Sequence, residues 1–285
     1  MKKIFSAGLA LLLCAASLAG CSANEPDASS ESGLEESGQP AAETETVSES
    51  ARSSRQEISA PAEEAPDSDE APVVYMTTDI SSEGLMAIYK ALGAQLPEGN
   101  IAVKISTGET GSNYLRPDLI GELVQTVDGT IVECNTAYGG ERANTAYHMQ
   151  LAEDHGYTAI ADVDIMDADG SMTLPVTGGT HLTENYVGAH FENYDYFIVL
   201  SHFKGHAMAG FGGAIKNISI GIASSDGKAR IHSGGTGGSM WGGDQNAFLE
   251  SMAEAGKSVA DYMDGNMLYI NVMNRLSVDC DCDGN

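Results

Sequence analysis

The sequence predicts an α/β domain with a largely parallel sheet and helices on both faces. From residue 73 onward, apolar runs of strand length alternate with longer segments in which apolar side chains recur every three or four residues. This alternation is typical of parallel sheets joined by crossover helices. One run, residues 196–200, contains only apolar and aromatic residues, which indicates a strand covered on both faces. About 210 residues suit a single domain better than two.

The predicted elements follow in order along the chain. Strands are expected where β-branched, aromatic and other apolar residues cluster, at residues 73–76, 100–106, 130–134, 194–200 and 267–272. Helices are expected where the apolar spacing is helical, at residues 83–96, 116–125, 141–155 and 246–263. Gly156 is expected to stop the third helix, because glycine readily adopts the left-handed conformation that closes a helix. Residues 157–193 carry no clear pattern.

The first 20 residues have the features of an export signal peptide. Lys2 and Lys3 precede an apolar run that is too short to span a bilayer comfortably. The run ends in Leu18-Ala19-Gly20-Cys21, which resembles the bacterial lipoprotein processing site. This resemblance implies cleavage before Cys21 and acylation of its thiol. We therefore expect a chain anchored in membrane lipid on the extracytoplasmic face of the cell membrane; the alternative is an ordinary signal peptide with a chance cysteine.

Residues 21–72 are predicted to form a disordered acidic linker. They are rich in Ser, Glu, Ala and Pro and cannot bury enough apolar surface to offset the entropy of ordering. The whole chain has 41 acidic and 14 basic residues, a net charge of −27. Such a charge repels phosphate backbones, so the sequence argues against nucleic-acid binding. The folded domain is then expected at residues 73–285.

Polar residues are concentrated in segment 201–217, directly after the apolar strand. Ligands of open α/β sheets bind at the carboxyl ends of strands. The segment contains two histidines, two lysines and four glycines. Lys204 and Lys216 are predicted to contact an unidentified anionic substrate or cofactor, and Lys216 is also a candidate base or imine-forming amine. Backbone close to a ligand and an amide contact are predicted at Gly210, Gly212, Gly213 and Asn217.

Histidines and cysteines offer candidate metal ligands. His202 and His206 are four residues apart, a spacing that places two imidazoles on one helical face, although Gly205 between them disfavours a helix. The alternative for each histidine is a hydrogen-bonded structural role. Cys280 and Cys282 would bridge each other only with strain. They are predicted to bind a transition metal or iron–sulfur cluster; the alternative is a disulfide between Cys134 and one of the two, with one thiol left over.

Segments 201–206 and 210–217 together resemble the family called domain of unknown function 362. Further matches lie at residues 135–140, around His148, at residues 155–156 and at residues 279–282. Members of this family are often described as uncharacterised iron–sulfur-centre proteins. The resemblance covers roughly residues 73–285 and implies a metal- or iron–sulfur-associated role. Relatives continue past the Cys280-x-Cys282 segment, so a C-terminal truncation is expected.

The spacing of Gly205-His206, Gly210 to Gly213 and Lys216 is also distantly similar to the nickel-pincer lactate racemase family. This similarity would imply roles for His206 and Lys216 in proton transfer or cofactor attachment.

The sequence leaves three functional hypotheses. The first is an exported, lipid-anchored protein with a metal or iron–sulfur site and a redox-linked role. The second is a module that binds a small anion without catalysis. The third is a degenerate or truncated domain with no activity. Loss of turnover on Lys216→Ala would support a catalytic site, whereas a change in affinity alone would support a binding module.

Overall fold

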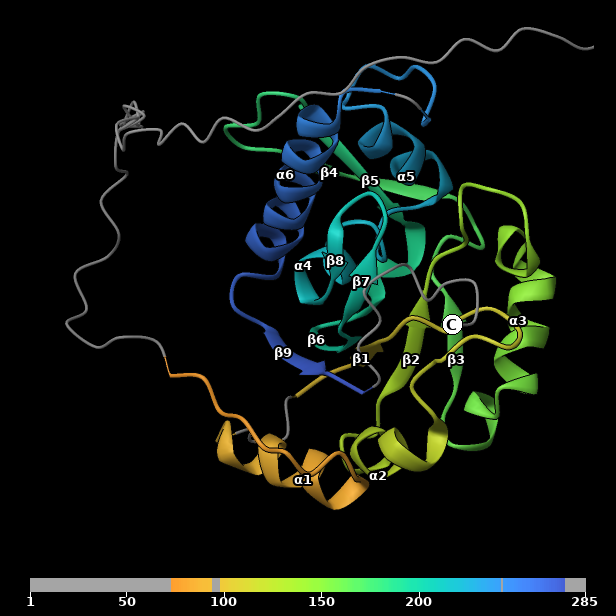
Figure 1. Ribbon diagram of the computed structural model, residues 1–285, viewed down its shortest axis with the longest axis vertical. Coiled ribbons are helices and arrows are strands. Elements are labelled where there is room, and N and C mark those ends of the chain that lie inside the picture. The colour runs from red at the N-terminus through yellow and green to blue at the C-terminus, as the bar shows by residue number, and fades with distance from the viewer. Residues whose placement is uncertain (1–72, 94–97, 242, 275–285) are drawn as a thin grey trace, which may run out of the picture. The chain divides into compact units, whose positions relative to one another are not determined.

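The computed structural model of the chain describes residues 73–93, 98–241 and 243–274 (Figure 1). Its centre is a five-stranded parallel sheet with the order β3-β2-β1-β6-β9. The strands are β1 (Ile101–Lys104), β2 (Thr130–Glu133), β3 (Val163–Ile165), β6 (Tyr196–His202) and β9 (Met267–Val272). The predicted α/β class with a parallel sheet is confirmed. Because all five strands run in the same direction, their carboxyl ends meet at one edge of the sheet.

Helices cover both faces of this sheet, as the sequence predicts. Figure 1 shows α1 (Ser82–Ala91) and α2 (Pro117–Thr126) on one side and α4 (Ala214–Ser219) and α6 (Gln245–Met263) on the other. The remaining helices are α3 (Thr145–Asp154) and α5 (Ser225–His232), with short 3-10 turns η1 (Glu141–Ala143), η2 (Tyr157–Ala159) and η3 (Ala189–Asn193). Alternate residues of β1 belong to different cores: Val103 packs with α1 and α2, and Ala102 packs with α4 and α6.

Two small antiparallel hairpins lie outside the main sheet. One joins β4 (Ser171–Pro175) to β5 (Glu184–Gly188), and the other joins β7 (Lys204–His206) to β8 (Gly210–Gly212). The sequence pattern identified neither hairpin. The β7–β8 hairpin matters most for function, because it carries part of segment 201–217 beyond the end of β6.

Several predicted boundaries need correction. The strand expected at residues 73–76 is wrong: these residues have no regular structure, and Val73 and Met76 are 71% and 77% exposed. The helix expected at 141–155 is divided into η1 and α3, because the Asn144 side chain accepts hydrogen bonds from the first backbone N–H groups of α3. Beyond α3, Gly156 has φ +84°, as expected for a helix stop.

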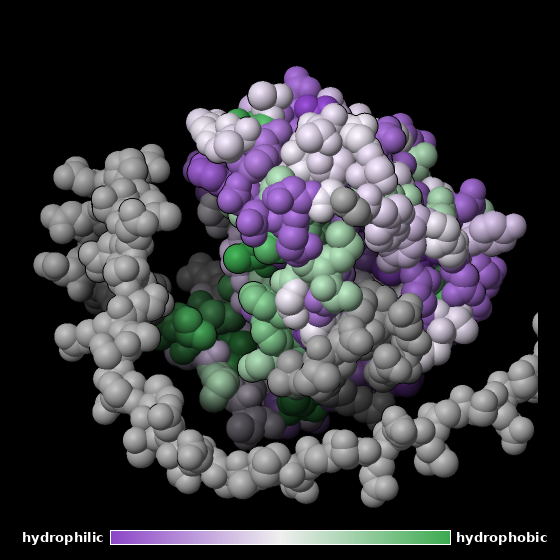
Figure 2. Space-filling model, turned by 45° about the horizontal axis from the view of Figure 1, so that its top comes forward, coloured by the Kyte–Doolittle hydropathy of each residue, from purple (hydrophilic) through white to green (hydrophobic). Residues whose placement is uncertain are grey.

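Exposed hydrophobic side chains accompany the outermost strand, β9. Tyr269 is 42% exposed and Met273, just after the strand, is 46% exposed. A groove of about 560 Å³ runs between this strand, α1 and residues 73–80. Figure 2 shows that hydrophobic surface on the visible face is concentrated on its lower left side, while most of the remaining surface is polar or neutral.

The predicted signal peptide, Cys21 and the acidic linker lie outside the described residues, as do Cys280 and Cys282. Acylation, membrane anchoring and metal binding by these cysteines therefore stay predictions. Within the described part of the chain, none of the helices combines the length and apolar character that a membrane span requires.

Candidate functional site

A cavity of about 130 Å³ lies at the carboxyl ends of β1, β2 and β6. Its wall combines the strand ends with the loop after β2, the β7–β8 hairpin and the helices α4 and α5. Most of the predicted site residues that the structure describes line it: His202, Lys204, His206, Gly212, Gly213, Lys216 and Asn217. Gly210 is not part of the lining; it begins β8 with φ +73°, a conformation that favours glycine at this tight hairpin.

The cavity wall is rich in positive charge. Its cationic side chains are Lys104, Arg142, Lys204, Lys216 and Lys228, whereas the carboxylate among the lining residues is that of Glu133. This is unusual in a chain whose net charge is −27. Cationic side chains are therefore concentrated at this cavity on a protein that is otherwise strongly acidic.

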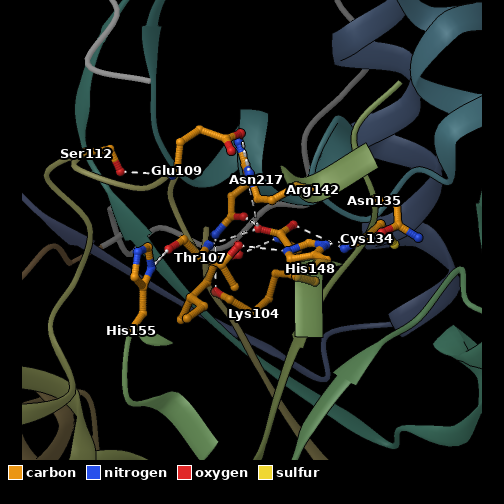
Figure 3. Close-up of polar contacts among 12 residues, drawn as sticks. Lys104, Thr107, Glu109, Ser112, Cys134, Asn135, Arg142, His148, His155 and Asn217 are labelled. Carbon is orange, nitrogen blue, oxygen red and sulfur yellow. Dashed lines mark hydrogen bonds and ion pairs between the residues drawn. The ribbon is translucent and has the colours of Figure 1, made fainter. Parts of the chain in front are cut away.

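Lys104 lies at the base of the cavity, here called its floor, and its hydrogen bonds connect β1, β2 and α4. Its side chain is fully buried, and Nζ donates hydrogen bonds to Ile105 O at 2.6 Å, Glu133 Oε1 at 2.8 Å and Asn217 Oδ1 at 2.8 Å. The Asn217 amide in turn donates to Lys104 O at 3.2 Å and to Ser201 Oγ at 3.0 Å. Asn217, predicted as a ligand contact, thus ties α4 to the ends of β1 and β6 (Figure 3).

Glu133 is ionised in this environment. Burial alone would raise the pKa of its carboxyl, but Lys104 and Arg142 lower the pKa to about 2 by Coulombic attraction. Backbone N–H groups of Thr107 and Cys134 also donate to the carboxylate, each at 3.2 Å. Arg142 lies 3.9 Å from Glu133 Oε2 and donates through Nε to Glu109 Oε1 at 2.7 Å.

The buried side chain of His148 is linked to Glu133 through Thr107. The Thr107 backbone N–H contacts Glu133, and the Thr107 hydroxyl lies 2.8 Å from His148 Nε2. His148 Nδ1 lies 3.3 Å from Asn135 Oδ1, an acceptor, so Nδ1 carries the proton and Nε2 accepts from Thr107. Burial lowers the pKa of His148 to about 3, which keeps the imidazole neutral. The charged pair of Lys104 and Glu133 thus lies beside a neutral imidazole whose two ring nitrogens are both hydrogen-bonded.

His206 is also neutral. Burial lowers the pKa of its imidazole to about 3, with further lowering by the nearby Lys216, His232 and Lys204. Its Nδ1 accepts hydrogen bonds from the backbone N–H groups of Met208 at 3.2 Å and Ala209 at 3.0 Å. Since Nδ1 is an acceptor, Nε2 carries the proton and His206 is a hydrogen-bond donor.

The described residues do not fit the predicted metal or iron–sulfur group. His202 Nε2 lies 2.6 Å from the Asn274 carbonyl oxygen, so this nitrogen is a hydrogen-bond donor. A metal bound to His206 Nε2 would require the imidazole proton to be on Nδ1, which already accepts two backbone N–H hydrogen bonds. The Cys134 thiol is free, and burial raises its pKa to about 12. Groups of three or more His, Cys, Asp or Glu suited to a metal are absent from the described part of the chain. His202 and His206 do not share a helix, as Gly205 between them indicated: they end the successive strands β6 and β7.

Sequence reasoning missed the charged residues of the floor. Lys104 and Glu133 lie within two strands that were predicted from their apolar neighbours. Arg142 and Lys228, which also line the cavity, lie further along the chain in η1 and α5. Lysine and glutamate are almost never fully buried unless they are paired. Two opposite charges within two apolar strands were therefore a usable signal for a buried ion pair.

The comparisons with known proteins identify a family but no activity. A family model described as "Domain of unknown function (DUF362)" matches residues 101–285, and the chain belongs to this family. The structure of the lactate racemase apoprotein from Thermoanaerobacterium thermosaccharolyticum is similar, with a TM-score of 0.45 and 18% sequence identity. That match covers 68% of this chain and 49% of the racemase chain, so this chain spans about half of its length. No curated protein has significant sequence similarity to the chain.

Proposed function

We propose that this member of the DUF362 family binds a small anionic molecule, a carboxylate or a phosphate, in the cavity at the carboxyl ends of β1, β2 and β6. The observation that carries the proposal is the charge of the wall, where five cationic side chains outnumber the one carboxylate found among the described lining residues. Glu133 pairs with Lys104 and lies 3.9 Å from Arg142, which also pairs with Glu109, and burial lowers the pKa of Lys228. The anion is therefore expected near Lys204 and Lys216, where a negative charge would interact favourably with the ammonium groups.

Lys204 and Lys216 are the proposed contacts of the anion. They come from β7 and α4, and both lie close enough to His206 to lower its pKa. Neutral His206 would add a hydrogen bond from Nε2–H. With Nε2 protonated and Nδ1 accepting two backbone N–H groups, His206 is suited to hydrogen-bond donation rather than to removing a proton from a ligand.

Calorimetric titration of the full chain tests the proposal, with inorganic phosphate, acetate and oxalate as probes and choline as a cationic control. A hydrogen bond to a charged group contributes about 1.5–3 kcal/mol. Lys204→Gln and Lys216→Gln should therefore each weaken binding about 10- to 100-fold. The matched control is Lys257→Gln on α6, where the same charge is removed from a side chain that is 58% exposed.

Affinity for the anions should also fall with added salt, because exposed parts of the site are screened. The proposal is wrong if none of the three anions binds at millimolar concentration. It is equally wrong if Lys257→Gln weakens binding as much as the two cavity variants do.

A further inference from the structure

One aromatic side chain lines the cavity and a second packs beside it. Tyr138, in the loop after β2, lines the cavity together with Met240, and the next residue is Trp241. The rings of Tyr138 and Trp241 have centroids 6.5 Å apart and are tilted by 51°. Tyr138 is 41% exposed and Trp241 is 57% exposed. Segments about one hundred residues apart in the chain thus bring two large, half-exposed rings to one place.

Neither ring belongs to the three buried apolar clusters of the described residues. Trp241 is the chain's one tryptophan, and burying such a side chain would remove a large apolar area from water. Instead a local turn presents it: the Ser239 hydroxyl accepts from Trp241 N–H at 3.1 Å and donates to Trp241 O at 3.0 Å.

We infer that the ligand of this cavity carries an aromatic ring beside its anionic group, and that the ring packs against Tyr138 and Trp241 while the anion lies among the lysines. The inference rests on the proposed function and narrows it to aromatic carboxylates or aromatic phosphate monoesters. Binding sites commonly combine a few charged groups that fix orientation with aromatic walls that supply contact area. Here the two parts are adjacent, since Tyr138 shares the cavity wall with Lys204 and Lys216.

Titration of the full chain with matched pairs of probes tests the inference. Inorganic phosphate is compared with phenyl phosphate, and acetate with benzoate, so that the two anion chemistries are separated. In at least one pair the aromatic member should bind about tenfold more tightly, the gain expected from one ring contact. Trp241 fluorescence should change with the aromatic probe and much less with its partner.

Two variants test whether Trp241 causes the tighter binding of the aromatic probe. Trp241→Ala should remove most of the tenfold advantage and leave the affinity for inorganic phosphate within about twofold. Tyr147→Ala, at a 68% exposed tyrosine of α3, is the matched control and should change neither affinity. Inorganic phosphate or acetate binding without any aromatic gain refutes the inference alone. Absence of binding by all four probes refutes both the inference and the proposed function.

Discussion

Replacing Lys104 with methionine removes the centre of the cavity floor with little change in side-chain volume. The substitution eliminates three hydrogen bonds from Nζ, to Ile105 O, Glu133 Oε1 and Asn217 Oδ1. Glu133 stays buried, with its side chain 4% exposed, and Oε1 keeps only the Cys134 N–H among its described partners. The variant therefore contains a buried carboxylate that has lost its nearest cation.

Two independent arguments give a similar loss in the free energy of unfolding for Lys104→Met. Breaking a buried ion pair by removing one partner typically costs about 3–5 kcal/mol. Independently, the pKa of Glu133 falls from an ordinary 4.5 to about 2 in the fold. A shift of that size corresponds to about 3 kcal/mol of stability, part of it due to Lys104. Because the folded pKa is the lower one, this contribution is complete above pH 4.5 and is lost as the pH falls toward 2.

Urea unfolding followed by circular dichroism measures the effect. Lys104→Met should lower the free energy of unfolding by about 3 kcal/mol at pH 7, and by clearly less at pH 3, where Glu133 of the variant is protonated. Lys257→Met, at an exposed lysine paired with Asp261, should cost less than about 1 kcal/mol at either pH. A cost below 1 kcal/mol for Lys104→Met at pH 7, or one that does not shrink at pH 3, would refute the reasoning.

Three further substitutions probe the same framework by urea unfolding. Gly221→Ala should cost about 2 kcal/mol and weaken anion binding, because its Cβ would clash with the Asn217 backbone oxygen and lie 2.7 Å from Lys104 Nζ. Unchanged stability would contradict this close packing. Thr107→Val should cost about 1–3 kcal/mol, because His148 Nε2 loses its donor, whereas Thr107→Ser should recover most of the loss. Glu254→Gln should cost about 1–3 kcal/mol, since the carboxylate accepts from three successive backbone N–H groups of the β4–β5 loop; a neutral result would mean that water replaces it.

The five strands of the sheet illustrate what the sequence reveals and what it does not. Runs such as 196–200 were predictable because a strand covered on both faces needs apolar residues at every position. Residues 73–76 have the same β-branched and aromatic composition, yet form no strand. Composition describes which side chains suit a sheet, whereas a strand also requires a neighbouring edge with which to exchange hydrogen bonds.

The site was predictable where its residues are close in sequence. Segment 201–217 was identified because histidines, lysines and glycines follow a buried strand, and most of these residues line the cavity. The ion pair of Lys104 with Glu133 was not identified, because it depends on β1 lying directly beside β2, an adjacency that one sequence does not specify. The protonation state of His206 depends on two backbone N–H groups in a hairpin that the pattern did not predict.

The burial of Cys134 bears on how the chain would behave during oxidative folding. Thiol–disulfide exchange proceeds through the thiolate, and with a pKa of about 12 only about one Cys134 thiol in 100,000 is ionised at pH 7. An ordinary cysteine with a pKa near 8.5 has about 3% thiolate under the same conditions. Once the domain has folded, Cys134 should react much more slowly than an exposed thiol, because its thiol is both protonated and buried. An oxidising compartment would then leave this sulfhydryl reduced, and scrambled cross-links through it would form only before the sheet closes around it.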